Sequence, residues 1–202
     1  MTNIFFDLDG TIIDSRNRLY TLFQELVPQS ALSFDAYWDM KRNKINHQQI
    51  LSRHFPAVDF DAFNRAWLDR IESPEMLALD TLYPNAAAVL RTLKKSHSLY
   101  VLTARQSKDN LIKELTDLGI IDAFNAVLLT EHKWSKEDLI GQTHVSEGIL
   151  IGDTGYDIQT AKACGLKSVA ITHGFLSADV LRSYEPDKII HSLSDIKKEG
   201  IA

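Results

Sequence analysis

Four aspartates and a threonine follow apolar runs of the chain, at points where buried strands would end. Asp7 and Asp9 come directly after the first run, Thr103 follows a second, and Asp153 and Asp157 follow a third. In an extended chain, residues two positions apart point to the same side, so Asp7 and Asp9 present their carboxylates together. Because ligands of parallel sheets bind beyond the carboxyl ends of the strands, we expect these five side chains to converge there.

Clustered carboxylates are most stable around a cation, because each raises the pKa of its neighbours. Oxygen ligands without His or Cys favour Mg²⁺ over zinc or copper. A lone aspartate after a strand is more often a helix cap or a turn former. Here two aspartates are followed by Gly-Thr, and a Gly-Asp-x-x-x-Asp group follows a later apolar run. Helix capping alone does not explain this combination. We therefore predict a magnesium site whose ligands are Asp7, Asp9, Asp153 and Asp157.

The rest of the chain supplies the elements that would position these residues. From Asn85 onward, apolar runs of strand length alternate with helical patterns, which predicts a parallel sheet covered by helices on both faces. The expected strands cover residues 3–6, 99–102, 126–129, 149–151 and 168–171, with a final apolar pair at 189–190. The expected helices cover residues 85–95, 108–118, 136–140 and 156–163.

Residues 16–71 show a different pattern, because apolar side chains recur there at the spacing of an amphipathic helix. The clearest examples are Leu19, Leu22, Phe23 and Leu26, and then Phe60, Phe63, Trp67 and Ile71. No strand pattern interrupts this block, and Pro74 and Pro84 bracket a linker after it. We therefore predict an α/β fold: a Rossmann-like, three-layer parallel-sheet core of residues 1–14 and 83–202, with an inserted all-helical domain at residues 15–82.

The composition excludes several classes of protein. The 202 residues include 22 Lys and Arg against 27 Asp and Glu, and the formal net charge of −5 argues against a nucleic-acid or anionic-membrane partner. A single cysteine, Cys164, excludes a disulfide framework and favours a reducing compartment. The chain shows no signal-peptide pattern and no apolar run of about 20 residues, so we expect a cytoplasmic protein without a membrane anchor. The oligomeric state stays open.

Three stretches resemble the motifs of one enzyme superfamily. FDLDGTIIDS at residues 6–15, LTARQ at 102–106 and GDTGYD at 152–157 are similar to the first, second and fourth motifs of the haloacid dehalogenase (HAD) superfamily. AKACGLKSVAITHGF, at residues 161–175, resembles the strand and glycine-containing loop of phosphoglycolate-phosphatase-like members. The resemblance implies the HAD fold with a helical cap of the C1 type between motifs one and two, where the helical block lies.

The resemblance also implies a role for each aspartate. Asp7 would attack the phosphorus atom and become an aspartyl phosphate, for which a carboxylate needs charge neutralisation by Mg²⁺ and a lysine. Asp9 would protonate the leaving alcohol, deprotonate the attacking water and ligate the metal through its main-chain carbonyl. Asp153 would bind Mg²⁺ directly, and Asp157 directly or through water. Because dehalogenases of the superfamily lack the second aspartate, Asp9 favours phosphoryl transfer over carbon–halogen cleavage.

By the same resemblance, the phosphoryl oxygens would be held by Thr103 and by main-chain N–H groups near Leu8 and Ala104. Thr103 alone is a weak signal, since threonine often caps helices. Arg105 follows it by two residues and could bind a substrate anion, but an arginine at a strand exit is as often an ion-pair partner. Thr103, Ala104 and Arg105 are therefore candidates for substrate binding.

The third motif of the superfamily, which supplies a lysine, is the least clear in this chain. TEHKWSKEDLI offers Lys133 and Lys136, without the proline that often follows this lysine. We favour Lys136 as the catalytic and substrate-binding lysine, because Lys-x-x-x-Ile at the start of a short helix resembles a variant of the motif. Lys133 is the alternative, and the lysine that does not serve would lie exposed on the surface.

Three cations, Lys41, Arg42 and Lys44, form a small basic group within the helical block. A solvated helix face is the simpler interpretation of this group. The alternative is that one or two of these side chains meet a second anionic group of the substrate.

These observations predict a Mg²⁺-dependent phosphatase that hydrolyses a small phosphorylated metabolite, a phosphomonoester, through an aspartyl phosphate. A phosphomutase similar to β-phosphoglucomutase is the nearest alternative, since it passes the phosphoryl group back to a sugar instead of to water. A response-regulator receiver is the non-enzymatic alternative, but its acceptor aspartate does not follow the first strand and it has no insert of this size. A dinucleotide-binding domain is disfavoured, because no Gly-x-Gly-x-x-Gly follows the first strand.

Overall fold

The computed structural model describes residues 2–198 and 200–201, and its contacts divide the chain into two compact units. One unit combines Met1–Asp14 with Thr81–Ala202, and the other is Ser15–Asp80. We call the first the α/β unit and the second the helical unit. Residues 81 and 82, which we assigned to the insert, pair with residues 13 and 14 as short antiparallel strands and therefore lie in the α/β unit.

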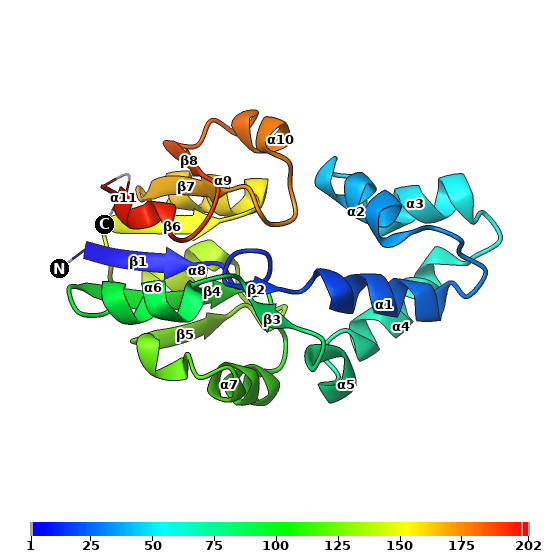
Figure 1. Ribbon diagram of the computed structural model, residues 1–202, viewed down its shortest axis with the longest axis horizontal. Helices are drawn as coiled ribbons and strands as arrows, with labels where there is room; N and C mark the ends of the chain where they lie inside the picture. Colours follow the sequence, from blue (N-terminus) through cyan, green and yellow to red (C-terminus); the bar gives the residue numbers. More distant parts are fainter. Residues whose placement is uncertain (1, 199, 202) are drawn as a thin grey trace. The chain divides into compact units, whose positions relative to one another are not determined.

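The α/β unit is built on a six-stranded sheet in which neighbouring strands are parallel (Figure 1). The strand order is β5-β4-β1-β6-β7-β8. The bounds are β1 Thr2–Phe6, β4 His97–Thr103, β5 Ala126–Leu129, β6 Gly148–Gly152, β7 Lys167–Ile171 and β8 Lys188–Ile190. A separate pair of two-residue strands, β2 Ile13–Asp14 and β3 Thr81–Leu82, continues into the two ends of the helical unit.

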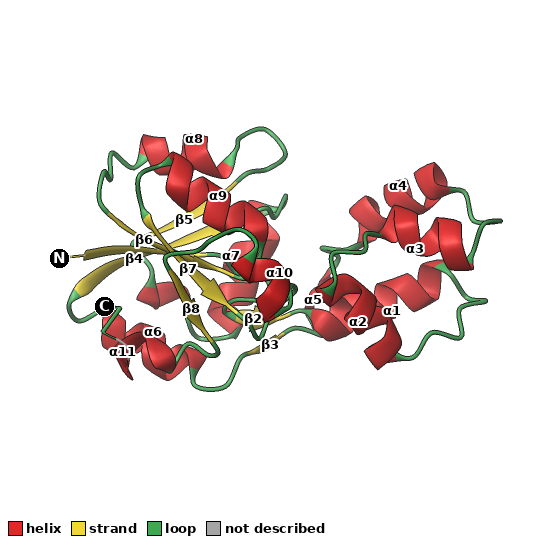
Figure 2. Cartoon of the chain, turned by 90° about the horizontal axis from the view of Figure 1, so that it is seen from above, coloured by secondary structure: helices red, strands yellow, loops and turns green. Residues whose placement is uncertain are grey.

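Helices cover both faces of this sheet, which gives the three layers of the predicted fold (Figure 2). Alternate residues of β1 point to opposite faces, so Ile4 and Phe6 pack with α6, α7 and α11, whereas Phe5 packs with α8 and α9. The helix α10 packs beside α9. The bounds are α6 Ala86–Leu93, α7 Lys108–Asp117, α8 Lys136–Gln142, α9 Gly155–Ala163, α10 Ala178–Arg182 and α11 Asp195–Lys198, with a 3₁₀ turn at Ile121–Ala123.

The helical unit consists of short helices, most of which begin at a polar capping residue. The side chains of Ser33, Asn46, Asp59 and Ser73 each accept a hydrogen bond from a backbone N–H of the following turn. These caps divide the block that periodicity alone left continuous. The bounds are α1 Arg16–Leu26, α2 Phe34–Arg42, α3 His47–His54, α4 Phe60–Arg70 and α5 Pro74–Leu77.

Aromatic rings fill the interior of the helical unit. The ring centroids of Phe23 and Tyr37 are 4.9 Å apart, and those of His47 and Trp67 are 4.2 Å apart. The His47 Nε2 atom lies 2.8 Å from the hydroxyl oxygen of Tyr37. Burial, with a smaller effect of the nearby Lys41 charge, lowers the pKa of His47 well below its ordinary value. His47 is therefore neutral inside this unit.

Lys41 differs from the other two members of the basic group, Arg42 and Lys44. Its side chain is partly buried and makes no hydrogen bond or ion pair within the described residues, whereas Arg42 and Lys44 both have partners. Burial lowers the pKa of Lys41 to about 8. Whether this group meets the substrate stays a prediction.

The structure confirms the predicted α/β fold. Each expected strand is present with small changes at its ends, as in β4, which begins at His97 where the pattern indicated Leu99. The pattern did not indicate β2, β3, α10 or α11, because two to five residues carry too little periodicity. No helix of the described residues is long and apolar enough to cross a membrane.

Candidate active site

The predicted site residues gather at one edge of the sheet. The strand β1 lies between β4 and β6, and the chain runs from β1 to β4 and β5 before it crosses to β6. This edge is the topological switch point, where α/β sheets bind their ligands. Asp7 follows β1, Thr103 ends β4 and Asp153 follows β6, so all three lie at the switch point.

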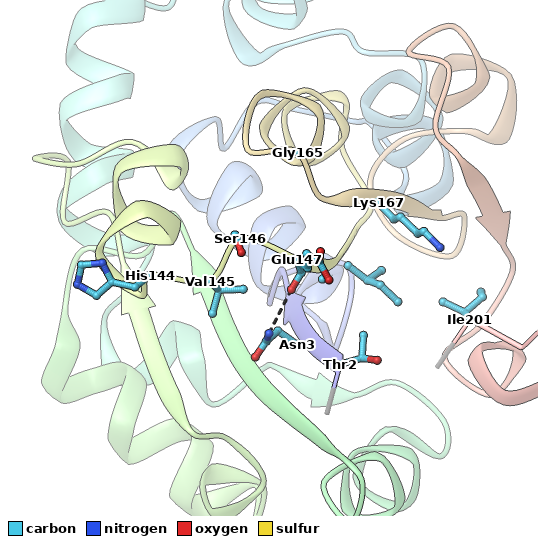
Figure 3. Close-up of a pocket in the computed structure, with 11 residues that line it drawn as sticks. Thr2, Asn3, His144, Val145, Ser146, Glu147, Gly165, Lys167 and Ile201 are labelled. Carbon is cyan, nitrogen blue, oxygen red and sulfur yellow. Dashed lines mark hydrogen bonds between the residues drawn. The ribbon is translucent and has the colours of Figure 1, made fainter.

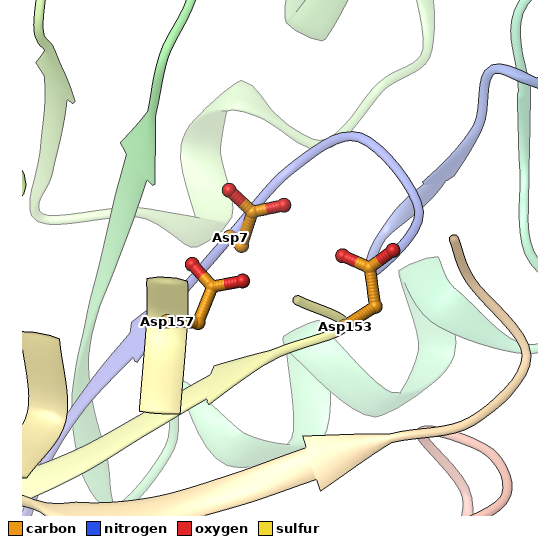
Figure 4. Close-up of side chains that lie close together, drawn as sticks. All are labelled: Asp7, Asp153 and Asp157. Carbon is orange, nitrogen blue, oxygen red and sulfur yellow. The ribbon is translucent and has the colours of Figure 1, made fainter. Parts of the chain in front are cut away.

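Three carboxylates lie close together here and project to the same side (Figure 4). Asp7, Asp153 and Asp157 each offer an oxygen atom, and these atoms lie within 4.8 Å of one another. All three residues are buried. The Lys136 Nζ atom lies 2.5 Å from Oδ1 of Asp7 and 2.6 Å from Oδ1 of Asp157. The structure therefore brings four of the predicted site residues into one buried charged cluster.

Burial makes several negative charges unfavourable in this cluster. It raises the pKa of Asp7 to about 7 against the opposing effect of Lys136, and Asp157 adds to the rise. Burial also raises the pKa of Asp153 well above its ordinary value, and Asp7 and Asp157 raise it further. Burial alone would lower the pKa of Lys136, but the carboxylates of Asp157 and Asp7 raise it, so the ammonium stays charged. The cluster holds more carboxylates than Lys136 neutralises.

Two hydrogen bonds orient Asp153. Thr11 Oγ1 donates to its Oδ1 at 3.1 Å, and the backbone N–H of Phe175 donates to its Oδ2 at 2.6 Å. Gly10 permits this approach, because its φ of 83° lies in the left-handed region and a Cβ would meet Oδ2 at 2.1 Å. The Gly-Thr pair that follows Asp9 therefore shapes the surroundings of Asp153.

Asp157 is fixed in the first turn of α9. Its Oδ2 accepts hydrogen bonds from N and Oγ1 of Thr154, at 3.1 and 2.6 Å, in a capping box. Its Oδ1 faces Lys136. Asp157 therefore caps a helix and belongs to the charged cluster at the same time.

Lys136 is held in place by contacts between α8 and α9. Its backbone N–H donates to the hydroxyl oxygen of Tyr156 at 3.2 Å, and that hydroxyl donates to Oε2 of Glu137 at 3.1 Å. Thr160 Oγ1 of α9 donates to Oε1 of Glu137 at 2.6 Å. The alternative lysine, Lys133, is 71% exposed, and its Nζ lies 3.6 Å from Glu131 Oε2. The structure thus places Lys136, and not Lys133, beside the nucleophile candidate.

Asp9 lies outside the group of three carboxylates and contacts Arg105 instead. The guanidinium donates from Nε to Oδ2 of Asp9 at 2.7 Å and from Nη2 to Oδ1 at 2.9 Å. Its Nη1 lies 3.0 Å from Oε2 of Glu114 on α7. Of the two residues that precede Arg105, Thr103 is buried and Ala104 is exposed. Of the two interpretations of Arg105, the structure shows the ion-pair partner.

The donor set suits a hard divalent cation. The three carboxylates supply only oxygen atoms, which Mg²⁺ prefers, whereas zinc and copper prefer nitrogen or sulfur. Burial, and the repulsion between the carboxylates, raise the pKa values of Asp7 and Asp153 and so disfavour their ionised forms. A cation bound here would stabilise the ionised carboxylates, so the residues present fit a magnesium ion.

A cavity of about 660 Å³ lies at the opposite edge of the sheet (Figure 3). Thr2, Asn3, Gly148 and Lys167 line it, and they stand at the amino ends of β1, β6 and β7. The aspartates of the cluster follow the carboxyl ends of strands, so this cavity lies away from them. It takes no part in the candidate site.

Sequence reasoning missed several supporting residues. Glu114 stands on α7 between the buried Leu111 and Leu115, and a carboxylate on an apolar stripe was a signal that it has a buried partner. Tyr156 directly precedes Asp157 and carried no such signal. The N–H of Phe175 is a backbone group, which no side-chain pattern reveals.

The chain is similar to several known proteins. A family model described as haloacid dehalogenase-like hydrolase matches residues 4–171. Pyrophosphatase PpaX of Halalkalibacterium halodurans is 23% identical over 97% of this chain and 95% of its own. Phosphoglycolate phosphatase of Neisseria gonorrhoeae is 24% identical over 96% of this chain and 90% of its own. A solved haloacid dehalogenase-like hydrolase of Streptococcus pneumoniae aligns with a TM-score of 0.81 at 25% identity, over 99% of this chain and 98% of that one.

The chain belongs to the haloacid dehalogenase-like hydrolase family, because the family model spans most of its length. This confirms the resemblance that the three motifs indicated. The family match and the relatives named above together assign the chain to the phosphatases of the family.

Proposed function

We propose that the protein is a Mg²⁺-dependent phosphatase that hydrolyses a small phosphomonoester through an aspartyl phosphate on Asp7. The observation that carries the proposal is the contact of Lys136 Nζ with Asp7 and Asp157, at 2.5 and 2.6 Å, beside a third buried aspartate. A carboxylate attacks a phosphate dianion only where positive charge offsets the repulsion. Lys136 supplies part of that charge.

The reaction takes two steps. In the first, a carboxylate oxygen of Asp7 attacks the phosphorus atom and the ester P–O bond breaks, while Asp9 gives its proton to the leaving oxygen. Since Lys136 holds Oδ1 of Asp7, Oδ2 is the attacking atom. In the second, a water oxygen attacks the phosphorus atom and Asp9 accepts the water proton. The bond between phosphorus and Asp7 then breaks, which releases inorganic phosphate.

The remaining residues hold the reacting groups. Thr103, Lys136 and the main-chain N–H groups near Leu8 and Ala104 bind the phosphoryl oxygens. Asp7, Asp153, Asp157 and the main-chain carbonyl of Asp9 would hold Mg²⁺. When bound, Mg²⁺ supplies the positive charge that offsets the carboxylates and the phosphate together.

The substrate class is proposed from the relatives. The curated relatives are named phosphoglycolate phosphatase and pyrophosphatase, so phosphoglycolate and inorganic pyrophosphate both belong in a substrate screen. Small sugar phosphates complete it, because a phosphomutase would convert a sugar phosphate into an isomer and release little phosphate. The ratio of phosphate to isomer therefore separates hydrolysis from transfer.

The test is phosphate release from this panel with Mg²⁺ and with a chelator. We expect release that depends on Mg²⁺, and a loss of about 10³-fold or more in Asp7→Asn, the range seen when a catalytic nucleophile is removed. Asp117→Asn is the matched control, because Asp117 is an exposed aspartate of α7. Undiminished turnover in Asp7→Asn would reject Asp7 as the nucleophile.

A further inference from the structure

The guanidinium of Arg105 lies between two carboxylates that come from different elements. On one side it makes two hydrogen bonds to Asp9, Nε to Oδ2 at 2.7 Å and Nη2 to Oδ1 at 2.9 Å. On the other side, Nη1 lies 3.0 Å from Oε2 of Glu114. A paired contact of this kind fixes the plane of the carboxylate as well as its position, which a single hydrogen bond does not.

The side chains of Asp9, Arg105 and Glu114 differ in their exposure to solvent. The Asp9 side chain is 22% exposed, whereas those of Arg105 and Glu114 are 4% and 6% exposed. Asp9 is therefore the solvent-accessible member of the three, and the guanidinium and Glu114 are buried. A substrate that enters meets Asp9 before it meets the guanidinium, which argues against Arg105 as a substrate contact.

The backbone around Arg105 is anchored on both sides. Its N–H lies 3.4 Å from Oγ1 of Thr103, and its carbonyl accepts a hydrogen bond from the N–H of Glu131 at 3.2 Å. Glu114 belongs to the buried face of α7. Two fixed elements, the β4 exit and α7, thus hold the guanidinium against Asp9.

We propose that Arg105, supported by Glu114, is a positioning residue that fixes the side chain of Asp9 for proton transfer. This inference rests on the proposed function, in which Asp9 protonates the leaving oxygen. Proton delivery matters when the leaving group is a basic alkoxide, and matters little for a stable phenolate such as p-nitrophenolate. Disturbing Arg105 is therefore expected to slow alkyl phosphates more than aryl phosphates.

The experiment compares kcat/KM for phosphoglycolate and p-nitrophenyl phosphate, both with saturating Mg²⁺, because kcat/KM reports the steps up to formation of the aspartyl phosphate. Arg105→Lys keeps the charge but loses the paired contact. We expect it to lose about 10- to 100-fold on the alkyl ester and less than about threefold on the aryl ester, a share of the usual contribution of general acid catalysis. Glu114→Gln is expected to show a smaller loss with the same preference.

Two controls separate positioning from other roles. Lys113→Gln alters an exposed side chain next to Glu114 on α7 and is expected to leave both values of kcat/KM unchanged. The inhibition constant of inorganic phosphate is expected to stay the same in Arg105→Lys. Equal losses on the two esters, or weaker binding of inorganic phosphate, would overturn the proposal in favour of a structural or a substrate-binding role.

The double variant Asp9→Asn/Arg105→Lys completes the test. If Arg105 acts through Asp9, the double variant loses no more on phosphoglycolate than Asp9→Asn alone. A further loss of tenfold or more would overturn the inference. An Asp9→Asn protein that loses equally on both esters rejects the acid role of Asp9 itself. When Asp9→Asn prefers the aryl ester but Arg105→Lys does not, only the inference about Arg105 fails.

Discussion

In the α/β unit, Lys136 contacts two of three buried aspartates, Asp7 and Asp157, whereas in the helical unit His47 is surrounded by aromatic rings. Both regions enclose ionisable groups, and in both burial shifts a pKa in the direction that favours the neutral side chain, as for Asp7 and His47. The pKa of Asp7 rises to about 7, and that of His47 falls well below its ordinary value. The difference is that the first region keeps several ionised groups that a cation would complete. In the second region His47 is neutral, and its ring already has a hydrogen-bond partner in the hydroxyl of Tyr37.

The two regions respond to pH in opposite directions. The folded protein binds the proton of Asp7 more tightly than the unfolded chain, so the contribution of Asp7 to stability falls as the pH rises from 3.8 through about 7. The folded protein binds a proton on His47 more weakly, so the contribution of His47 falls as the pH drops below 6.5. At neutral pH the unfavourable burial of ionised groups is therefore found at the candidate active site, where a bound cation would offset it.

Of the changes considered, removal of the Lys136 side chain is expected to alter the difference between the two regions most. Lys136→Ala leaves Asp7 and Asp157 without their cation, and we expect phosphate release to fall by about 10²- to 10³-fold, the usual loss for one electrostatic contact in a reaction centre. Steady-state kinetics on p-nitrophenyl phosphate with saturating Mg²⁺ measures it. Lys133→Ala is the matched control and is expected to lose less than about threefold. A large loss in the control beside a small loss in Lys136→Ala would transfer the role to Lys133.

Magnesium affinity is expected to sharpen the contrast. Because Mg²⁺ must displace the protons that Asp7, with a pKa of about 7, and Asp153, whose pKa is also raised, retain in the metal-free protein, its affinity rises with pH by up to about tenfold per pH unit for each proton displaced. Calorimetric titration of the metal-free protein between pH 5.5 and 8 measures this dependence. Asp7→Asn is expected to make this dependence shallower, because one of the displaced protons is then missing. Constant affinity across the range in the unchanged protein would contradict the prediction.

The smallest expected effect lies in the helical unit. His47→Phe keeps an aromatic ring among its neighbours but removes the group that must give up a proton on folding below pH 6.5. The loss of the contact between His47 and the Tyr37 hydroxyl lowers its Tm at every pH, so the titration is tested by the pH dependence: between pH 8 and pH 5 we expect the Tm of the variant to fall by about 2–4 °C less than that of the unchanged protein, which corresponds to about 1 kcal/mol in a chain of this size. His54→Phe, an exposed position of the same helix, is the control. A Tm difference that is the same at pH 5 and pH 8 would show that His47 titration is not the cause.

Much of the α/β unit could be predicted because its strands are buried on both faces. Residues 126–129 form β5 as the apolar run indicated, and strand ends fix where the aspartates lie. The pair β2 and β3 could not be predicted, since each has two residues and their partners lie far apart in the sequence. The pair forms because residues 13–14 and 81–82 meet in the folded chain, which no local sequence pattern indicates.

The candidate site divides in the same way. Asp7, Asp153 and Asp157 were predicted from their places after strands, and Lys136 from its resemblance to a variant of the superfamily's third motif. The contact between Asp9 and Arg105 joins residues 96 positions apart, and one sequence holds no record of which arginine faces which carboxylate. The sequence limited Arg105 to two interpretations, and only the packing of β4 against α7 distinguishes them.

The strands β2 and β3 also affect how the inserted helical unit can change in evolution. Ile13 lies opposite Leu82 and Asp14 opposite Thr81, so the chain leaves the α/β unit and returns to it at neighbouring points. An insertion with adjacent ends can be lengthened, shortened or exchanged without displacing the strands at its base. Natural selection can therefore alter residues 15–80 extensively while the strands of the α/β unit and the aspartates that follow them keep their places.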